Sequence, residues 1–184
     1  GGDIVNLGDR REEYDTFFRI MRELCANAIC VPVPGNHEWS YDKDLSVYAD
    51  YWPMPQNGPD ADKNSTWSFV FNGVGWQMRR KATGDWLKAN IKNLKEKGGA
   101  DTIVDVQHYQ VFQWAKKSTD LGSKGLCDVF DAEGGVRLCL FGHRHIHQRS
   151  LPLLFEGNGK ATTKEKSEYG PDTKGTIYMQ SPSM

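Results

Sequence analysis

The sequence predicts an α/β fold, a sandwich in which a mixed β-sheet is flanked by helices. Short apolar runs typical of strands alternate with helical patterns in the first half of the chain, and strands dominate later. The length of 184 residues suits a single domain, residues 1–184. With 26% charged and 38% hydrophobic residues, the composition is that of a folded chain rather than a disordered one.

The order of the elements follows from apolar periodicity and from turn residues. A strand shows a short apolar run that ends at glycine, proline or asparagine. A helix shows apolar residues three or four positions apart. Helices are expected over residues 13–26 and 84–97, with a helical turn at 111–116. Strands are expected over residues 3–7, 28–33, 67–71, 74–78, 102–106, 136–141, 151–155 and 176–179.

Composition marks three of the connections. Asn72-Gly73, between two expected strands, is a strong hairpin turn. Residues 38–66 hold several aromatic residues and prolines, so a long loop is expected there. A loop of that length in a compact domain is usually functional or mobile. The Gly- and Lys-rich residues 156–174 are also expected to form a loop.

Charge and hydropathy exclude some classes of partner. The formal net charge of -1 gives no reason to expect nucleic acid or an anionic membrane. No apolar run approaches the roughly 18 residues of a membrane helix. The chain begins Gly1-Gly2-Asp3 without a methionine, so we expect it to be N-terminally truncated.

The four cysteines leave the cellular compartment open. No pair has the two-residue spacing of a zinc ribbon. Cys139 lies in an apolar run and is expected to be a buried free thiol. A bridge between Cys25 and Cys30 is an open alternative. Asn64-Ser65-Thr66 is a glycosylation sequon, which matters only in a secreted protein.

All five histidines fall just after three of the apolar runs. Histidine is the commonest metal ligand, and ligands placed past the ends of successive strands converge at one edge of an open α/β sheet. Together with Asp9 and Asn36 they offer carboxylate, amide and imidazole donors, which suit Zn, Mn or Fe rather than a thiolate site. A carboxylate such as Asp9 can bridge two metals, the usual device for phosphate ester hydrolysis. The histidines are His37, His108, His143, His145 and His147.

Over nearly its whole length the sequence resembles the calcineurin-like metallophosphoesterases. The motifs that carry the resemblance are Gly8-Asp9, Gly35-Asn36-His37-Glu38, His108 and Gly142-His143-Arg144-His145, in the family's order. The segment 147–149 and the spacing to residues 175–178 look more like the purple acid phosphatase branch. The resemblance implies a metallophosphoesterase-type sandwich of mixed β-sheets with two metal ions. It also implies hydrolysis of a phosphate mono- or diester by in-line attack of a metal-bound hydroxide.

The resemblance also implies a role for each motif residue. Asp9 would bridge the two metals, and His145 would bind the second one. His37 is similar to the family residue that contacts the phosphate and protonates the leaving group, a general-acid role. Glu38 would orient His37 or its loop. The remaining ligands of the first metal would be Asn36, His108 and His143, and the substrate contacts would be Asn36, His37 and, as a less favoured alternative to a structural role, His147.

The sequence departs from the family pattern in three places. The family's first motif, an Asp followed two residues on by His or Gly, has no counterpart before Asp9, because Asp3 lies inside the first expected strand. One metal site therefore has four candidate ligands, whereas the other keeps only Asp9 and His145. The tyrosine ligand of purple acid phosphatases, expected three residues after the Asp, is Glu12, and the residues after His108 are Tyr109-Gln110 rather than the usual proline.

Two functions from different classes remain open. The first is a metal-dependent phosphoesterase, and the second is a catalytically impaired phosphoesterase-fold subunit that binds a partner. A structural single-zinc site is a third alternative, which asparagine ligation argues against. Taken one at a time, Asp9 is also typical of a helix start, Asn36 of a turn and His108 of a structural histidine. The sequon and the phosphatase resemblance lean towards the secretory route.

These hypotheses make two predictions. We expect Asp9, Asn36, His108 and His143 to converge on one point, and a scatter of more than about 10 Å would refute this, because ligands bind an ion at about 2 Å. We also expect the chain to hydrolyse p-nitrophenyl phosphate or its bis ester only poorly, because one metal site is incomplete.

Overall fold

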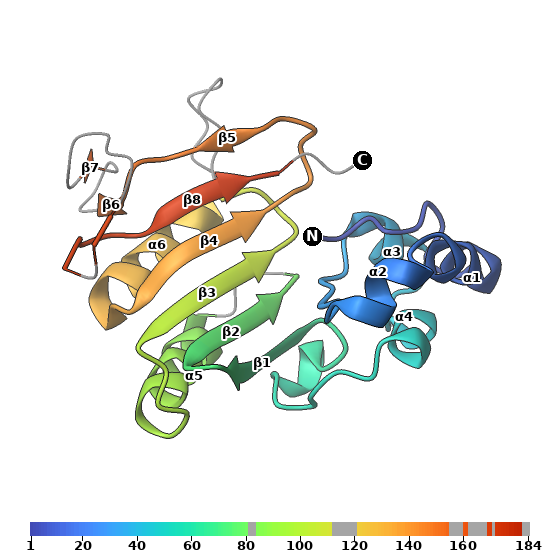
Figure 1. The fold of residues 1–184 in the computed structure, drawn as a ribbon, viewed down its shortest axis with the longest axis horizontal. Helices are drawn as coiled ribbons and strands as arrows, with labels where there is room; N and C mark the ends of the chain where they lie inside the picture. Colours follow the sequence, from blue (N-terminus) through green and yellow to red (C-terminus); the bar gives the residue numbers. More distant parts are fainter. Residues whose placement is uncertain (81–83, 112–120, 155–159, 162–168, 171, 182–184) are drawn as a thin grey trace.

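A six-stranded mixed sheet forms the centre of the molecule (Figure 1). The computed structural model describes residues 1–80, 84–111, 121–154, 160–161, 169–170 and 172–181. The strand order is β1-β2-β3-β4-β8-β5, and β6 (Leu153–Leu154) pairs with β7 (Lys160–Ala161) in a separate two-stranded sheet. The strands of the main sheet are β1 (Thr66–Phe71), β2 (Val74–Arg79), β3 (Thr102–Gln107), β4 (Val136–Phe141), β5 (Gln148–Arg149) and β8 (Ile177–Gln180).

Four neighbouring strands of the main sheet, β2, β3, β4 and β8, run parallel. The outer strands are antiparallel, because β1 pairs with β2 as a hairpin and β5 pairs with β8. Parallel neighbours end at the same edge of a sheet. The residues that follow β2, β3 and β4 therefore lie beside one another at one edge, which we call the carboxyl edge.

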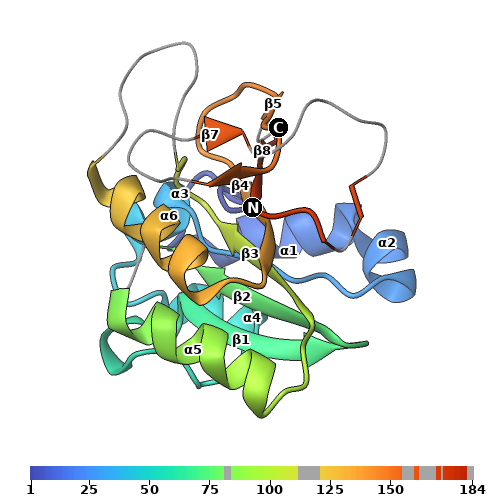
Figure 2. The same ribbon diagram turned by 90° about the vertical axis from the view of Figure 1, so that its left-hand side faces the viewer.

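One face of the sheet is covered by α5 (Gly84–Glu96) and α6 (Leu121–Glu133) (Figure 2). Apolar side chains of both helices pack against the sheet in a single core. Burying one such side chain contributes about 1.5–3 kcal/mol, so this layer supplies most of the driving force for folding. Its buried members include Leu87, Ile91 and Leu94 of α5, Leu126 and Phe130 of α6, and Ile103, Val136, Cys139 and Tyr178 of the sheet.

The N-terminal part of the chain forms a second layer beyond the carboxyl edge (Figure 1). It has its own core, centred on Tyr14, Tyr48 and Trp52. The chain also returns to the sheet here, because Val33 is buried against Trp67 and Met78. The helices of this layer are α1 (Arg11–Ile20), α2 (Arg22–Asn27), α3 (Asn36–Tyr41), α4 (Ser46–Tyr51) and the short 3-10 helix η1 (Asp60–Asp62).

The predicted fold class is confirmed: the structure is a mixed six-stranded sheet flanked by helices. The hairpin at Asn72-Gly73 is also confirmed, with φ angles of 50° and 75° that match a type I′ turn. The expected helix over residues 13–26 is present as α1 and α2, which meet at Met21. Most of the expected helical turn at 111–116 lies outside the described residues. The other elements that agree to within about two residues, the usual scatter of helix and strand boundaries, are β1, β2, β3, β4, β8 and α5.

Two expected strands, residues 3–7 and 28–33, are not formed. The backbone N–H groups of residues 3–7 donate to the carboxylates of Glu38 and Glu13 instead of to a neighbouring strand. In residues 28–33, Pro32 lacks an N–H group and disfavours strand pairing. Val5 and Val33 are nevertheless buried, so in these two segments part of the apolar pattern reflects burial without strand formation. The expected loop over residues 38–66 also contains α4 and η1.

Below the carboxyl edge, an ion pair is fully buried between β2 and β3. The Arg79 guanidinium binds Asp105 through two parallel hydrogen bonds, Nε to Oδ1 at 2.7 Å and Nη2 to Oδ2 at 2.8 Å. Both side chains are 0% exposed. Burial opposes the charge on Arg79, but the Asp105 carboxylate outweighs burial and raises the pKa of Arg79. Gln77 Nε2 adds a third hydrogen bond to Asp105, at 2.8 Å.

Removing one member of this pair is expected to destabilise the protein strongly. Asp105→Ala leaves the Arg79 charge buried without its partner, so we expect a loss of about 3–5 kcal/mol in the free energy of unfolding. Urea denaturation monitored by circular dichroism measures this loss. The double variant Arg79→Met, Asp105→Leu should recover most of it, because no charge remains buried. A single variant as stable as the wild type would contradict the prediction.

The cysteines agree in part with expectation. Cys139 and Cys127 are buried free thiols, and burial raises the pKa of Cys127 to about 12. Cys25 and Cys30 are thiols whose sulfur atoms lie 3.0 Å apart, so a bridge between them stays a prediction. Within the described ranges, no helix has the length and apolar character needed to cross a membrane.

Candidate metal centre

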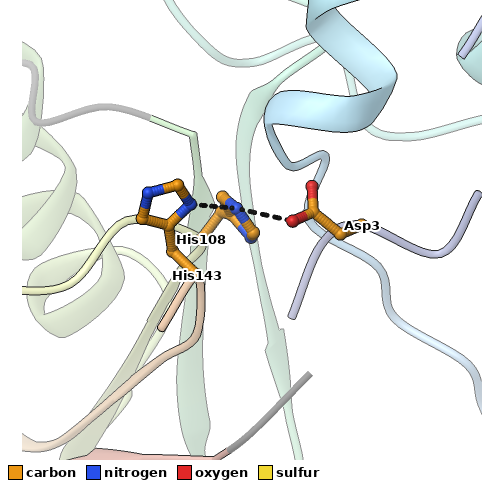
Figure 3. A group of neighbouring side chains, drawn as sticks. All are labelled: Asp3, His108 and His143. Atoms are coloured by element: carbon orange, nitrogen blue, oxygen red, sulfur yellow. Dashed lines mark hydrogen bonds and ion pairs between the residues drawn. The ribbon is translucent and has the colours of Figure 1, made fainter. Parts of the chain in front are cut away.

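Four polar side chains converge at the carboxyl edge, those of Asn36 and of Asp3, His108 and His143, and Figure 3 shows the last three. His108 Nε2 lies 3.0 Å from Asn36 Oδ1, 3.2 Å from His143 Nδ1 and 3.3 Å from Asp3 Oδ2. Asn36 Oδ1 lies 2.8 Å from His143 Nδ1. Asn36, His108 and His143 therefore meet as predicted, but the carboxylate that joins them is that of Asp3.

Parallel strands bring the two histidines together. His108 directly follows β3, and His143 follows β4 after Gly142. The loops after the two strands are joined by a hydrogen bond from Gly142 N to His108 O, at 2.9 Å. Gln180, at the end of β8, is buried and donates from Nε2 to the carbonyls of Gly142 and Arg144 at 2.9 and 2.8 Å. The position of His143 is thus fixed from both neighbouring strands.

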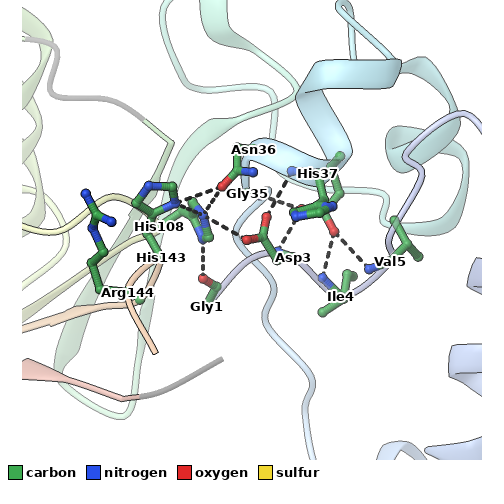
Figure 4. A network of polar contacts seen from close by, with 12 residues as sticks. Gly1, Asp3, Ile4, Val5, Gly35, Asn36, His37, His108, His143 and Arg144 are labelled. Atoms are coloured by element: carbon green, nitrogen blue, oxygen red, sulfur yellow. Dashed lines mark hydrogen bonds and ion pairs between the residues drawn. The ribbon is translucent and has the colours of Figure 1, made fainter. Parts of the chain in front are cut away.

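The backbone around His108 determines which ring nitrogen faces the cluster. His108 Nδ1 lies 2.9 Å from the carbonyl oxygen of Gly1, which can only accept a hydrogen bond (Figure 4). Nδ1 therefore carries the proton, and in the neutral ring the lone pair of Nε2 points at Asp3, Asn36 and His143. Metal-binding histidines usually donate their second ring N–H to a carbonyl in this way.

The donor set fits one divalent ion. Ligand atoms about 2.0–2.2 Å from a common ion lie about 2.8–3.6 Å from one another in tetrahedral or octahedral geometry. Four separations among these atoms, 2.8–3.3 Å, fall in this range, and the ligand atoms of Asp3, His108 and His143 all lie within 4.8 Å of one another. When both imidazole rings are neutral, His143 Nδ1 is the one atom of the four that can carry a proton. Without a cation, the lone pairs of Asp3 Oδ2, Asn36 Oδ1 and His108 Nε2 would then face one another. A cation bound by Asp3, Asn36, His108 and His143 removes this conflict.

A buried carboxylate, that of Glu38, holds the segment that carries Asp3. Its Oε1 accepts hydrogen bonds from the backbone N–H groups of Ile4 at 2.7 Å and Val5 at 3.1 Å. Its Oε2 accepts from Asp3 N at 2.9 Å and from Gly35 N at 2.5 Å. Glu38 is 0% exposed and belongs to α3, the helix that begins with Asn36. One side chain thus fixes Asp3 relative to Asn36.

Unusual backbone geometry accompanies the cluster. Asp3 and His143 have φ angles of 55° and 68°, in the left-handed region that side chains other than glycine rarely adopt. Such strain is concentrated at functional sites. Gly35 is also required, because a Cβ atom there would lie 2.1 Å from Asp3 Oδ1. The chain therefore uses strained backbone and a glycine to bring Asp3 against Asn36.

The local electrostatics favour the protonation states of His143 and Asp3 that bind metals. Burial, followed by the neighbouring His108, lowers the pKa of His143, so its imidazole is neutral near pH 7. For Asp3, burial by itself raises the pKa, but the hydrogen bonds to His108 and to the His37 N–H lower it overall. Asp3 is therefore ionised at neutral pH. A neutral imidazole and an ionised carboxylate are the forms that bind metals.

Comparison with known families agrees with this geometry. A family model described as calcineurin-like phosphoesterase matches residues 1–147. The chain belongs to the calcineurin-like phosphoesterase family. Membership implies metal-dependent hydrolysis of phosphate esters as the general class of activity. A search of curated proteins found no match.

The structure brings Asp3, and not the expected Asp9, to this cluster. Asp9 is exposed, and its Oδ1 lies 3.7 Å from Nε of the neighbouring Arg10. It lies two residues before α1, whose N-cap residue is Arg10. Before Gly35-Asn36-His37-Glu38 the sequence contains two Gly-Asp pairs, Gly2-Asp3 and Gly8-Asp9. The first was dismissed because residues 3–7 were expected to form a strand, and this strand does not form.

Two other expected site residues lie outside the cluster. His145 and His147 are exposed. His145 is near enough to contribute to the lowered pKa of His143. Among the residues that the structure describes, the only group of three or more His, Cys, Asp or Glu side chains close enough to hold an ion is Asp3, His108 and His143. The roles of His145 at a second metal and of His147 at the substrate therefore stay predictions.

His37 lies beside the cluster and is held at two points. Its backbone N–H donates to Asp3 Oδ1 at 2.9 Å, and its Nδ1 lies 2.8 Å from the carbonyl oxygen of Asn6. Counted from Asp3, the position of the purple acid phosphatase tyrosine is occupied by Asn6. That tyrosine is therefore missing whether Asp3 or Asp9 is the ligand, and the resemblance to this branch stays unconfirmed.

Proposed function

We propose that this calcineurin-like phosphoesterase hydrolyses a phosphate mono- or diester with Asp3, Asn36, His108 and His143 as ligands of one metal ion. The main support for this proposal is the convergence of the four donors, with separations of 2.8–3.3 Å between neighbouring ligand atoms. A bound Zn, Mn or Fe ion supplies a Lewis acid that activates water and offsets charge on the phosphoryl oxygens. With the metal in place, Asn36 still has its amide N–H groups to donate to a phosphate oxygen.

In this proposal His37 supplies the proton for the leaving group. A carbonyl oxygen only accepts, so the contact with Asn6 O places a proton on His37 Nδ1. Nε2 is then the ring atom that can gain or release a proton. Its backbone contact with Asp3 keeps the ring next to the metal ligands. Protonation of a departing alkoxide by a positioned imidazole is general-acid catalysis, worth about 10²–10⁴ in rate.

The second metal ion of the family site remains part of the proposal through His145. Asp3 has two carboxylate oxygens, and its Oδ1 is held by His37 N whereas its Oδ2 faces His108. A carboxylate in this position can contribute to both ions. We expect the ion bound by Asp3, Asn36, His108 and His143 to bind more tightly than an ion at His145, because more protein donors surround it.

His37→Ala tests the general-acid role, with Phe71→Ala as the control for removal of an exposed aromatic ring. We expect His37→Ala to lower metal-dependent hydrolysis of bis-p-nitrophenyl phosphate by at least about 100-fold, from an already low rate. Metal content measured by mass spectrometry should not change, because the ring is not a ligand. Phe71→Ala should keep at least half of the rate. Equal rates for His37→Ala and the wild type would refute the role of His37.

The alternative function, a catalytically impaired subunit, has one observation in its favour. Large apolar side chains are exposed on α1 and just after α2, with Ile20 73% and Ile29 72% exposed. Exposed apolar groups of this kind occur at protein interfaces. The two functions differ in turnover: stoichiometric metal binding without metal-dependent hydrolysis of either p-nitrophenyl ester would favour the subunit.

A further inference from the structure

A pocket of about 480 Å³ lies between α3, η1 and the end of β2. Arg80, which lines it, directly follows β2. Arg79 pairs with Gln107 in the sheet, so Arg80 and the metal ligand His108 are the next two residues along neighbouring strands. Adjacent strands are about 4.8 Å apart. The pocket therefore shares the carboxyl edge with the metal centre.

Another part of the pocket wall comes from α3, the helix that begins with Asn36. Trp39 lines the pocket and lies three residues after Asn36 in α3. Residues three apart in a helix are neighbours on the same side. The Arg80 guanidinium lies over the Trp39 ring, 4.6 Å from its centre, and Lys43 Nζ lies 3.6 Å from the centre of the same ring. Two cations thus gather on one indole at the pocket wall.

Arg80 is a buried cation with unused hydrogen-bond donors. Its side chain is only 5% exposed, and neither Nε nor Nη1 has a hydrogen-bond partner in the described part of the chain. Leaving buried charged donors unpaired is unfavourable, so such groups are normally matched by an acceptor. The indole face attracts the guanidinium but accepts no hydrogen bond from its edge.

The carboxylates that also line the pocket do not fill this role. Asp60 pairs with Lys63 at 2.9 Å. Asp44 accepts the backbone N–H of Ser46 at 3.2 Å. Asp62 reaches neither of the unpaired Arg80 nitrogens, since both are without a partner. The three acidic residues therefore limit the charge of the pocket, and Arg80 Nε and Nη1 are left without an acceptor among the described residues.

We propose that this pocket binds an anionic group, a phosphate or a carboxylate, through the Arg80 guanidinium with help from Lys43. A guanidinium pairs with either group through two parallel hydrogen bonds. The volume lies in the range of small-molecule sites, about 300–1,000 Å³, so an organic moiety fits with the anion. The anion site rests on the proposed function and specifies its substrate as a phosphoester whose leaving group carries a second anionic group.

Titration of metal-free protein with inorganic phosphate tests the site without any turnover. Calorimetry should show that Arg80→Gln weakens phosphate binding at least about tenfold, as expected for a lost charge-assisted pair worth about 1.4 kcal/mol or more. Arg10→Gln, at an exposed arginine, and Asp3→Asn, in the metal centre, should bind phosphate like the wild type. Phosphate binding that survives Arg80→Gln but is lost in Asp3→Asn would overturn the proposal.

The wild type provides a second measurement in case Arg80→Gln fails to fold. The ¹⁵Nε–H resonance of Arg80 should shift on addition of phosphate, and the absence of a shift at saturation would overturn the site. The substrate is tested with 2-carboxyphenyl phosphate against phenyl phosphate. We expect a higher kcat/KM for the carboxylated ester in the wild type and loss of this preference in Lys43→Gln. Equal values in the wild type would overturn the substrate assignment while leaving the phosphate result standing.

Discussion

Replacing Asp3 with asparagine is expected to weaken binding of Mn²⁺ or Zn²⁺ by at least about 100-fold, because loss of even an indirect contact at a metal site costs 10- to 100-fold. The carboxylate supplies the only negative charge among the four donors, next to His108 Nε2 at 3.3 Å. Asparagine keeps the shape of the side chain but removes that charge. Competition with a chromophoric chelator measures the change in affinity.

Asp9→Asn is the matched control, because it makes the same change six residues later in the sequence. Asp9 is exposed and forms an ion pair with Arg10 at the surface, so its replacement should leave metal affinity unchanged. The metal-free Tm of both variants should be close to that of the wild type, which separates a ligand effect from a folding effect. A loss of affinity in Asp9→Asn with none in Asp3→Asn would restore Asp9 as the ligand.

The two aspartates also show how far the site could be predicted from the sequence. His108 and His143 follow apolar runs that form parallel strands, so periodicity alone placed them at one edge. Asn36 was found through its motif. Asp3 was not predicted because the apolar pattern of residues 3–7 indicates a strand, whereas these residues form none and only Val5 among them is buried. The earlier Gly-Asp pair was the available signal.

Other differences have equally local causes. The helix α6 was not predicted, and its sequence contains Gly122 and Gly125, each of which costs about 1 kcal/mol relative to alanine in a helix. Tertiary packing outweighs this cost, since Leu126 and Phe130 are buried against the sheet. Helix propensity is a local quantity, whereas this packing involves strands far away in the sequence. A single sequence therefore gives little indication of α6.

Replacing Glu38 with alanine is expected to cause the largest loss of stability of any single change at the site. Four backbone N–H groups, those of Asp3, Ile4, Val5 and Gly35, lose their acceptor. Hydrogen bonds to a charged group contribute about 1.5–3 kcal/mol each, so we expect at least about 5 kcal/mol to be lost even though the contributions are not additive. This approaches the whole stability of a small domain. Urea denaturation measures the loss.

Glu38→Gln separates the effect on the site from the effect on the fold. Glutamine retains one oxygen for Ile4 and Val5 but directs an amide group at the N–H groups of Asp3 and Gly35. We therefore expect a loss of about 2–3 kcal/mol together with a fall in metal affinity, because the Asp3 carboxylate is no longer fixed against Asn36. Glu13→Gln is the control, since Glu13 accepts from Asn6 and Leu7 in the same segment without contacting Asp3.

A Glu38→Gln protein that binds metal like the wild type would show that Asp3 is positioned without the buried carboxylate. The expected result has a wider consequence for the motif Gly35-Asn36-His37-Glu38. Gly35 leaves room for Asp3, Asn36 is a proposed metal ligand, and the N–H of His37 donates to Asp3 Oδ1. Glu38 then fixes the backbone that carries Asp3. Each of the four consecutive residues thus acts on the same carboxylate or the same ion, which explains why this short segment carries so much of the site.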